Sequence, residues 1–407
     1  MATDIKWVTN SLKGSLLQSE TIKEFSLASV EAVHSLHQGF PGYSATPLVD
    51  LVHLAKSLQL GGLYVKDESY RFGLNAFKGL GGSYAIAKYL AGKLGLDITE
   101  VSYDLLTSPE VKSKLGEITF VTATDGNHGR GVAWAAAKLG HKAVVYMPKG
   151  SAVERLENIK REGADASITD LNYDDAVRLA AANARKYGWV VVQDTAWQGY
   201  HDMPLWIMQG YATMAIEAYQ DLTKWQVTPT HVFLQAGVGS FAAAVQAFLI
   251  NAYPDSPPKV VIVEPHAADC VYRSAAAADG KPRFVTGDMD TIMAGLACGE
   301  PSTIAWDILA ASSDTFISCP DYVAARGMRI LGNPLGSDER IISGESGAVT
   351  TGIVSMIMAN PKLAGLRQAL ELDKSSHVLV FSTEGDTDRR NYRSIVWDGA
   401  YHSPVDY

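Results

Sequence analysis

The chain has 407 residues, of which 47% are hydrophobic and 19% are charged, and its formal net charge is −9. At about 150 residues per domain, this length predicts two or three packed units. The acidic balance and the lack of a basic stripe argue against nucleic acid as a partner, and no apolar run is long enough to span a membrane.

The amino-terminal segment and the cysteines indicate a cytoplasmic protein. Asp4 precedes any apolar run, and the segment lacks the basic start and cleavage site of a secretory signal. Cys270, Cys298 and Cys319 lie far apart without the spacing of metal ligands, so we expect reduced thiols and no metal site. A bridge between Cys270 and Cys298 stays open as an alternative.

Short β-branched runs alternate with alanine-rich stretches of helical character along most of the chain. Such alternation predicts an α/β protein with mostly parallel strands. The first series comprises strands at 118–123, 142–147, 166–168 and 189–193 with helices at 130–139, 152–162 and 173–186. A second series has strands at 231–235, 260–263 and 377–381, so two sheets are expected.

Residues 75–82 (NAFKGLGG) place Lys78 in a glycine-rich turn. A lysine in a partly dry turn can lose its proton near neutral pH, and only the neutral amine forms a Schiff base. The glycines would let backbone and cofactor approach closely. The alternative is a solvated lysine in a flexible loop.

Residues 122–131 (TATDGNHGRG) form a turn between a predicted strand and a predicted helix. Open backbone N–H groups at such a turn can grip a carboxylate, and Asn127 could donate to a phenolic oxygen. Asp125 could instead be a helix N-cap and His128 a polar residue near the helix start.

Residues 235–242 (QAGVGSFA) follow a strand and open a helix, which is typical of a phosphate-binding loop. The same residues also fit a dinucleotide fingerprint through Gly237, Gly239 and Ala242. Glu264, at the end of the next strand, would then bind a ribose. This alternative describes a NAD-dependent oxidoreductase, but it leaves the Lys78 segment unexplained.

Taken together, these motifs resemble the fold-type II pyridoxal phosphate enzymes, the group of threonine dehydratase and the tryptophan synthase β chain. The resemblance implies two open, twisted, mostly parallel sheets in two domains, with the active site in the cleft between them. Residues 1–90 and 225–407 would form a larger domain that anchors the cofactor, and residues 91–224 a smaller domain that carries the substrate loop.

The same resemblance implies roles for individual residues. Lys78 would carry pyridoxal 5'-phosphate as a Schiff base. Residues 381–388 (FSTEGDTD) resemble the segment whose serine faces the pyridine nitrogen, and residues 342–348 (ISGESGA) resemble a segment near the cofactor. The implied cofactor-binding residues are Lys78, Asn127, Gly237, Val238, Gly239, Ser240 and Ser382, and the implied substrate-binding residues are Thr124, Gly126, Asn127, His128 and Glu345.

Within this group, four segments are most similar to those of the diaminopropionate ammonia-lyases: residues 75–79, 125–129, 193–197 and 204–211. The similarity implies α,β-elimination of 2,3-diaminopropionate to pyruvate and two ammonia molecules, by a homodimer. Both the D- and the L-isomer would be accepted, with Asp125 as the base for the D-isomer and Asp194 for the L-isomer. Without the resemblance, Asp194 would be interpreted as a turn residue.

Two further functions stay open beside the lyase and the oxidoreductase. An ammonia-lyase of the D-serine or threonine dehydratase type would use the same carboxylate-gripping loop on a different amino acid. A non-catalytic pyridoxal phosphate binder would keep Lys78 but release no ammonia.

Overall fold

The structure, a computed structural model, describes residues 4–15, 20–124 and 126–403 of the chain. The chain divides into two compact units. The first comprises Met1–Leu27, Ala45–Tyr70 and Met214–Tyr407, and the second comprises Ala28–Ser44 and Arg71–Thr213. Among the described residues, we find no helix with the length and apolar character that a membrane crossing requires.

The first unit contains a seven-stranded sheet in the order β1-β10-β9-β8-β11-β3-β2. The five inner strands are parallel, and the two edge strands, β1 and β2, pair antiparallel to their neighbours. The strands are β1 (Lys6–Thr9), β2 (Leu48–Asp50), β3 (Gly62–Asp67), β8 (His231–Gln235), β9 (Lys259–Pro265), β10 (Thr315–Cys319) and β11 (His377–Ser382).

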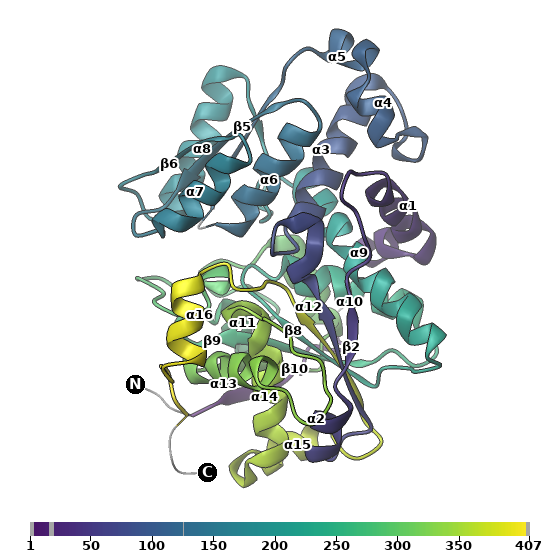
Figure 1. Cartoon of the computed structure of the whole chain (residues 1–407), viewed down its shortest axis with the longest axis vertical. Coiled ribbons are helices and arrows are strands. Elements are labelled where there is room, and N and C mark those ends of the chain that lie inside the picture. Colours follow the sequence, from purple (N-terminus) through teal and green to yellow (C-terminus); the bar gives the residue numbers. More distant parts are fainter. Residues whose placement is uncertain (1–3, 16–19, 125, 404–407) are drawn as a thin grey trace. The chain divides into compact units, whose positions relative to one another are not determined.

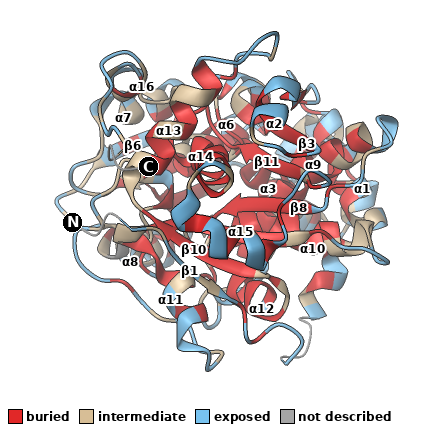
Figure 2. Ribbon diagram, turned by 90° about the horizontal axis from the view of Figure 1, so that it is seen from below, coloured by how far each residue is buried: buried red, intermediate tan, exposed pale blue. Residues whose placement is uncertain are grey.

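Burial explains why the inner strands are mostly apolar. Every residue of β3, β8 and β10 is buried, and Figure 2 shows the centre of this sheet as buried ribbon. Parallel strands covered on both faces need apolar side chains on both sides, so their sequences do not alternate. The helices of this unit are α2 (Val52–Ser57), α10 (Ser240–Ala252), α11 (Cys270–Ala277), α12 (Thr303–Ser312), α13 (Asp321–Gly332), α14 (Glu345–Ala359), α15 (Ala364–Leu370) and α16 (Arg389–Val396).

Helices α13 and α14 lie side by side in this unit (Figure 1) and approach each other at two glycines. A Cβ on Gly327 would lie 2.0 Å from the carbonyl oxygen of Ala348, and one on Gly352 would lie 2.0 Å from that of Val323. Neither position leaves room for a side chain. Helix α14 in turn packs on β8 and β11, the central strands of the sheet.

The second unit contains a parallel four-stranded sheet in the order β6-β5-β4-β7. Its strands are β4 (Thr119–Ala123), β5 (Lys142–Met147), β6 (Asp165–Ile168) and β7 (Val190–Val191). Its helices are α1 (Leu27–Gln38), α3 (Gly79–Leu94), α4 (Tyr103–Thr107), α5 (Pro109–Leu115), α6 (Asn127–Lys138), α7 (Val153–Arg161) and α8 (Tyr173–Tyr187), together with the first part of α9 (Asp202–Lys224), which continues into the first unit. In the two units taken together, short 3-10 turns occupy Glu20–Phe25, Glu68–Gly73, Ile98–Glu100, His266–Ala268, Ala294–Leu296 and Pro361–Leu363.

The predicted α/β class and the two mostly parallel sheets are confirmed. The predicted boundaries place residues 71–90 with the larger domain, whereas in the structure these residues belong to the second unit, because α3 packs closely against α6.

Glycines in three helices allow this close packing in the second unit. A Cβ on Gly131 of α6 would lie 2.7 Å from the carbonyl carbon and oxygen of Lys78, and one on Gly82 of α3 would lie 3.0 Å from the carbonyl oxygen of Gly131. A Cβ on Gly210 of α9 would lie 2.4 Å from the carbonyl oxygen of Leu80. The glycines around Lys78 therefore serve helix contacts, in addition to any room that they leave for a ligand.

The helix contact makes Gly131 a sensitive position. We expect Gly131→Ala to destabilise the protein by about 1–3 kcal/mol, because the new methyl group overlaps the backbone at Lys78. Gly92→Ala is the matched control, since Gly92 is exposed on α3 and a Cβ there would have no neighbour within 4 Å. Urea unfolding would measure both, and equal midpoints for the two variants would contradict the packing argument.

Candidate active site

Lys78 stands directly before α3 as its N-cap residue, and its Nζ contacts the carboxylate of Asp194. The Nζ–Oδ2 distance is 2.5 Å, and the two side chains are 19% and 8% exposed. Asn75 has a positive φ of 59°, which turns the chain towards the helix. A largely buried lysine therefore has one carboxylate within direct contact.

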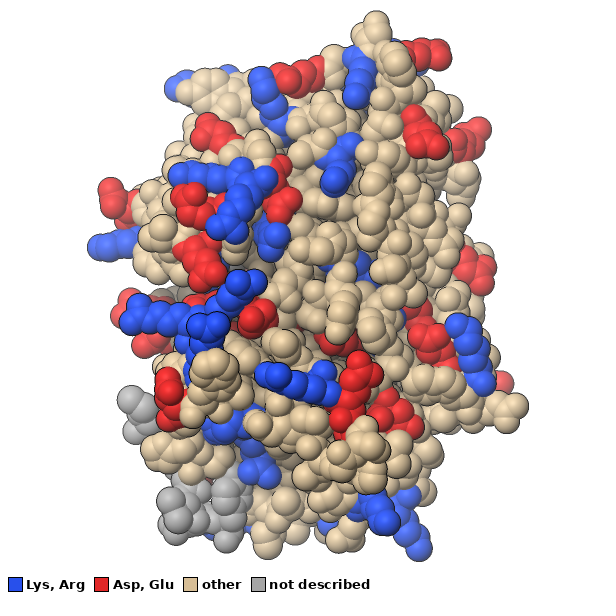
Figure 3. All heavy atoms as spheres, in the orientation of Figure 1, with Lys and Arg blue, Asp and Glu red and all other residues tan. Residues whose placement is uncertain are grey.

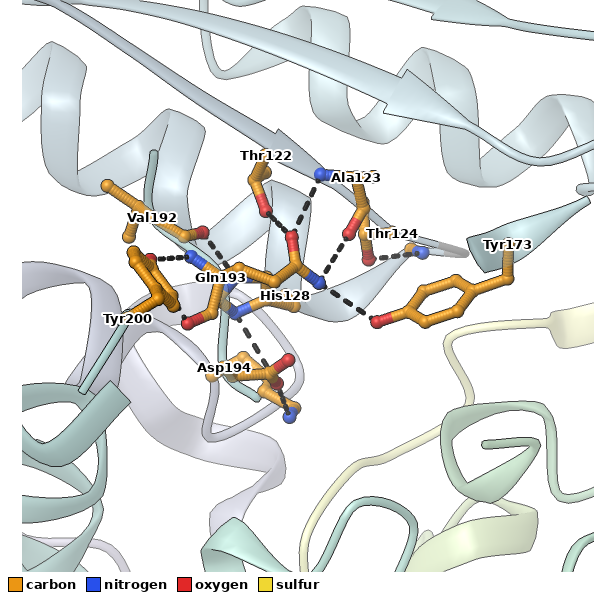
Figure 4. A network of polar contacts seen from close by, with 11 residues as sticks. Thr122, Ala123, Thr124, His128, Tyr173, Val192, Gln193, Asp194 and Tyr200 are labelled. Atoms are coloured by element: carbon orange, nitrogen blue, oxygen red, sulfur yellow. Dashed lines mark hydrogen bonds and ion pairs between the residues drawn. The ribbon is translucent and has the colours of Figure 1, made fainter. Parts of the chain in front are cut away.

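Asp194 follows β7, whose carboxyl end lies beside that of β4 in the parallel sheet. Figure 4 shows how side chains fix the backbone on either side of it. The hydroxyl of Tyr200 accepts a hydrogen bond from the Gln193 backbone N–H (2.8 Å) and donates one to the carbonyl of Val191 (3.0 Å). The segment that carries Asp194 is thus held by its own local contacts.

The side chain of Gln193 joins this segment to the end of β4 (Figure 4). Its oxygen accepts from the Thr122 hydroxyl (2.8 Å) and the Ala123 N–H (3.1 Å), and its nitrogen donates to the Ala123 carbonyl (3.0 Å) and the Tyr173 hydroxyl (2.9 Å). Both ends of the amide are satisfied, so its orientation is fixed. The sequence does not predict Gln193 and Tyr200 as site residues, although the segment at 193–197 is characteristic of the family.

His128, in the first turn of α6, faces Asp194 (Figure 4). Its Nε2 donates to the carbonyl of Val192 (2.8 Å), and its Nδ1 lies 3.6 Å from Oδ2 of Asp194. Since a carbonyl only accepts, Nε2 carries a proton. Burial lowers the pKa of His128 and favours the neutral ring, whose Nδ1 lone pair then faces Asp194. The structure thus places His128 beside the predicted base; its predicted contact with substrate stays a prediction.

Burial and charge act in opposite directions on this cluster. Burial favours a lower pKa for Lys78, as the sequence suggests, but the Asp194 carboxylate and the Tyr211 hydroxyl reverse the effect and raise the pKa of Lys78 above its usual value. Burial raises the pKa of Asp194, but its neighbours His128 and Lys78 lower it by more, so that it falls to about 2. Burial lowers the pKa of His128, against the attraction of Asp194. Lys78 and Asp194 therefore form an ion pair at neutral pH.

The predicted substrate loop is described except at Asp125, which lies outside the described residues. The Thr124 hydroxyl accepts from the Gly126 N–H (3.0 Å), so this donor already has a partner. Gly126 precedes α6 and is buried, and Asn127, the first residue of the helix, is half-buried. The loop stands at the carboxyl end of β4, next to the strand that leads to Asp194.

In the first unit, the predicted phosphate loop connects β8 with α10. Gly239 has a φ of +92° and is the N-cap residue of this helix, and a Cβ there would lie 3.2 Å from the Cβ of Ala305. A Cβ on Gly237 would lie 3.2 Å from the sulfur of Cys298. Ser240 begins the helix, and the carbonyl of Val238 accepts from the Ser302 N–H (2.8 Å). The glycine-lined helix start fits a phosphate group.

Ser382, at the carboxyl end of β11, is buried and donates to the hydroxyl of Ser343 (2.8 Å). The neighbouring Thr383 hydroxyl accepts from the side-chain nitrogen of Gln235 (2.9 Å), whose buried oxygen has no hydrogen bond to any described residue. Hydroxyl and amide groups that gather beside a phosphate loop suit a polar, aromatic cofactor.

Two predicted acids have structural partners. Glu345, the first residue of α14, is 3% exposed and accepts a hydrogen bond from the side-chain amide of Asn391. Glu264 is fully buried and accepts from the backbone N–H groups of Val271 (3.0 Å) and Tyr272 (2.5 Å) at the start of α11. Because both of its oxygens serve this helix, the interpretation of Glu264 as a ribose-binding acid is not supported.

All three cysteines are free thiols, so the structure does not contain the alternative bridge between Cys270 and Cys298. In the part of the chain that is described, no group of three or more His, Cys, Asp or Glu side chains could hold a metal ion.

Positive and negative side chains are interspersed on the face shown in Figure 3.

The chain is similar to known enzymes over nearly its whole length. Residues 40–383 match the family model described as pyridoxal-phosphate dependent enzyme. A diaminopropionate ammonia-lyase from Salmonella typhimurium (strain LT2) is 56% identical over 369 residues, which cover 90% of this chain and 91% of that protein.

Two crystal structures of diaminopropionate ammonia-lyase from Escherichia coli are similar in fold. The complex with D-serine has a TM-score of 0.91 and 49% identity, over 98% of this chain and 99% of that chain. The complex with an aminoacrylate-PLP azomethine reaction intermediate has a TM-score of 0.90 and 48% identity, over 99% of both chains.

The ion pair predicts a pH-dependent effect of Asp194→Asn on stability. A carboxyl with a lowered pKa stabilises the fold above its unfolded pKa of 3.8, and this contribution is lost as the pH falls towards about 2. We expect the variant to lose roughly 2 kcal/mol of unfolding free energy near neutral pH, and less below pH 4.

Urea unfolding at several pH values measures this difference. Glu20→Gln is the control, because its ion pair with Lys23 is exposed and should matter little at any pH. A loss for Asp194→Asn that stays constant from neutral pH to pH 2 would show that the charge of Asp194 is not the cause.

Proposed function

Because this chain belongs to the pyridoxal-phosphate dependent enzymes, and within them to the diaminopropionate ammonia-lyases, we infer that it converts 2,3-diaminopropionate and water to pyruvate and two molecules of ammonia. The observation that carries the inference is the direct contact between Lys78 and Asp194 in a chain that is 56% identical to such an enzyme. A lysine and an adjacent carboxylate are the two groups that the reaction needs first.

Lys78 would hold the cofactor through its ε-nitrogen, and Gly237, Val238, Gly239 and Ser240 would bind the phosphate by backbone N–H groups. Ser382 would face the pyridine nitrogen, and Asn127 would donate to the phenolic oxygen. When bound, pyridoxal phosphate supplies an electron sink for the pair left at Cα after proton removal. In this proposal the phosphate loop and Ser382 belong to the first unit, and Lys78 and Asn127 belong to the second.

Asp194 would take the α-proton of the L-isomer. It is ionised at neutral pH and largely buried, and its backbone is held by Tyr200 and Gln193, so the base is oriented before substrate binds. Asp125 would take the α-proton of the D-isomer. Two bases are needed because the two isomers present this proton on opposite sides.

The leaving group explains why acids stand in the loop. Amide ion is a very poor leaving group, so the β-amine must depart as ammonia from its protonated form. A carboxylate near the β-carbon can hold that ammonium until the bond breaks. Thr124, Gly126, Asn127, His128 and Glu345 would line the site of the substrate.

D-serine is an alternative substrate in this proposal. One similar Escherichia coli structure is a complex with D-serine, which supports the prediction that D-serine fits this loop; threonine is the other predicted alternative. The oxidoreductase alternative has no such support, since Glu264 caps a helix. We also propose that the enzyme works as a homodimer in the cytoplasm, on the grounds of its family and its free thiols.

The covalent role of Lys78 can be tested by borohydride reduction of the purified enzyme followed by peptide mapping. We expect the reduced cofactor on Lys78 and loss of the visible absorption band. Lys66 is an internal control, because it is also buried and paired, with Glu217 at 2.8 Å. A label on Lys66, on another lysine, or on none would refute the assignment.

The division between the two aspartates predicts opposite isomer effects. Asp194→Asn should reduce ammonia release from L-2,3-diaminopropionate by roughly 10²–10⁴-fold, the usual contribution of a general base, and largely spare the D-isomer. Asp125→Asn should do the reverse. The assay compares both isomers, D-serine and L-threonine. Equal losses on both isomers from each variant would exclude the division, and faster turnover of serine or threonine would change the substrate.

A further inference from the structure

Tyr211 lies on α9 and has no role in the reaction proposed above. Its side chain is fully buried, and its ring centroid lies 4.7 Å from that of Phe77. The Nζ of Lys78 lies 5.2 Å from each of these two ring centroids. The two rings therefore flank the amine and stabilise its charge by cation-π attraction.

Helix packing holds Tyr211 in this place. A Cβ on Gly81 of α3 would lie 2.5 Å from a ring carbon of Tyr211, so only glycine fits beneath the ring. The preceding residue, Gly210, brings α9 against the backbone of Leu80. The ring is consequently fixed relative to the helix that Lys78 begins.

The hydroxyl of Tyr211 is buried and forms no hydrogen bond of standard geometry to any residue that the structure describes. Such a group is costly to keep, which suggests that it has a partner at another stage. Burial raises the pKa of Tyr211, with Lys78 acting against this shift and Asp194 adding to it. The phenol therefore stays neutral and keeps a proton to donate.

The other groups around Asp194 are already committed. The Tyr200 hydroxyl donates to Val191, and His128 donates through Nε2 to Val192 and presents a lone pair at Nδ1. Lys78 pairs with Asp194 through the same nitrogen that the proposed function assigns to the cofactor. Of the three neutral side chains Tyr200, His128 and Tyr211, only Tyr211 has an O–H or N–H donor that forms no hydrogen bond of standard geometry to a described residue.

We propose that Tyr211 is a positioning residue that donates a hydrogen bond to the Asp194 carboxylate whenever the Lys78 nitrogen is engaged by the cofactor. The hydroxyl then replaces the lysine as the nearest donor, orients the carboxylate towards the α-proton and keeps it ionised. This inference rests on the proposed function, in which Asp194 is the base for the L-isomer.

The test compares the wild-type holoenzyme with Tyr211→Phe, which keeps the ring and removes only the hydroxyl. In protein labelled with [4-¹³C]aspartate, the Asp194 resonance is identified by its absence in Asp194→Asn and is followed as a function of pH. We expect its titration to move upward by about one pH unit in Tyr211→Phe, because a hydrogen bond to the charged form is lost. The acidic limb of kcat for the L-isomer should move by the same amount, while the profile for the D-isomer stays in place.

Tyr219→Phe is the matched control, since it removes a hydroxyl from the part of α9 in the first unit, where the ring packs on Phe248 and Tyr253. It should change neither the titration nor either profile. An unchanged Asp194 titration in Tyr211→Phe, or equal effects on both isomers, would overturn the role of Tyr211. If the wild type releases ammonia from neither isomer, the proposed function fails, and the carboxyl titration alone still decides whether Tyr211 donates to Asp194.

Discussion

The ion pair between Lys78 and Asp194 is the interaction on which the second unit depends. A charge in a largely buried position is tolerated only beside its opposite, and removal of one partner leaves the other uncompensated. Helix α3 supplies the cation and the end of β7 supplies the anion, so the contact joins a helix start to a sheet edge. The residues proposed for chemistry are for this reason also residues that stability requires, and a variant at either position changes both properties together.

The geometry of this pair is set by helix packing more than by the turn that contains the lysine. Gly131 and Gly210 allow α6 and α9 to press against the backbone near Lys78, where any side chain would collide. His128 and Tyr211 stand on those same two helices, and both face the pair. Three packed helices therefore hold His128 and Tyr211 in place around the amine of Lys78. Groups on rigid elements are positioned precisely, as a catalytic site requires.

The sequence predicts several buried strands because their apolar runs are nearly independent of context; residues 142–147 and 231–235 form β5 and β8 with the same ends. It misses the edge strands β1 and β2, which are only four and three residues long and exist because a neighbour pairs with them, and it also misses the buried inner strands β3 and β10. Asp194 is predicted by family resemblance alone, since a lone aspartate after a strand is typical of a turn. The contact of Tyr211 with Lys78 depends on how α9 packs against α3, and local patterns carry no information on that contact.

The close contact also couples the protonation of Lys78 to that of Asp194. When Lys78 loses its positive charge, the pKa of Asp194 rises. The carboxylate then becomes a stronger base, as removal of a proton from the substrate requires. Chemistry at the lysine and basicity at the aspartate are thereby coupled through Coulomb attraction. An isomer whose proton goes to Asp194 must show this coupling in its pH profile, and an isomer served by another base need not.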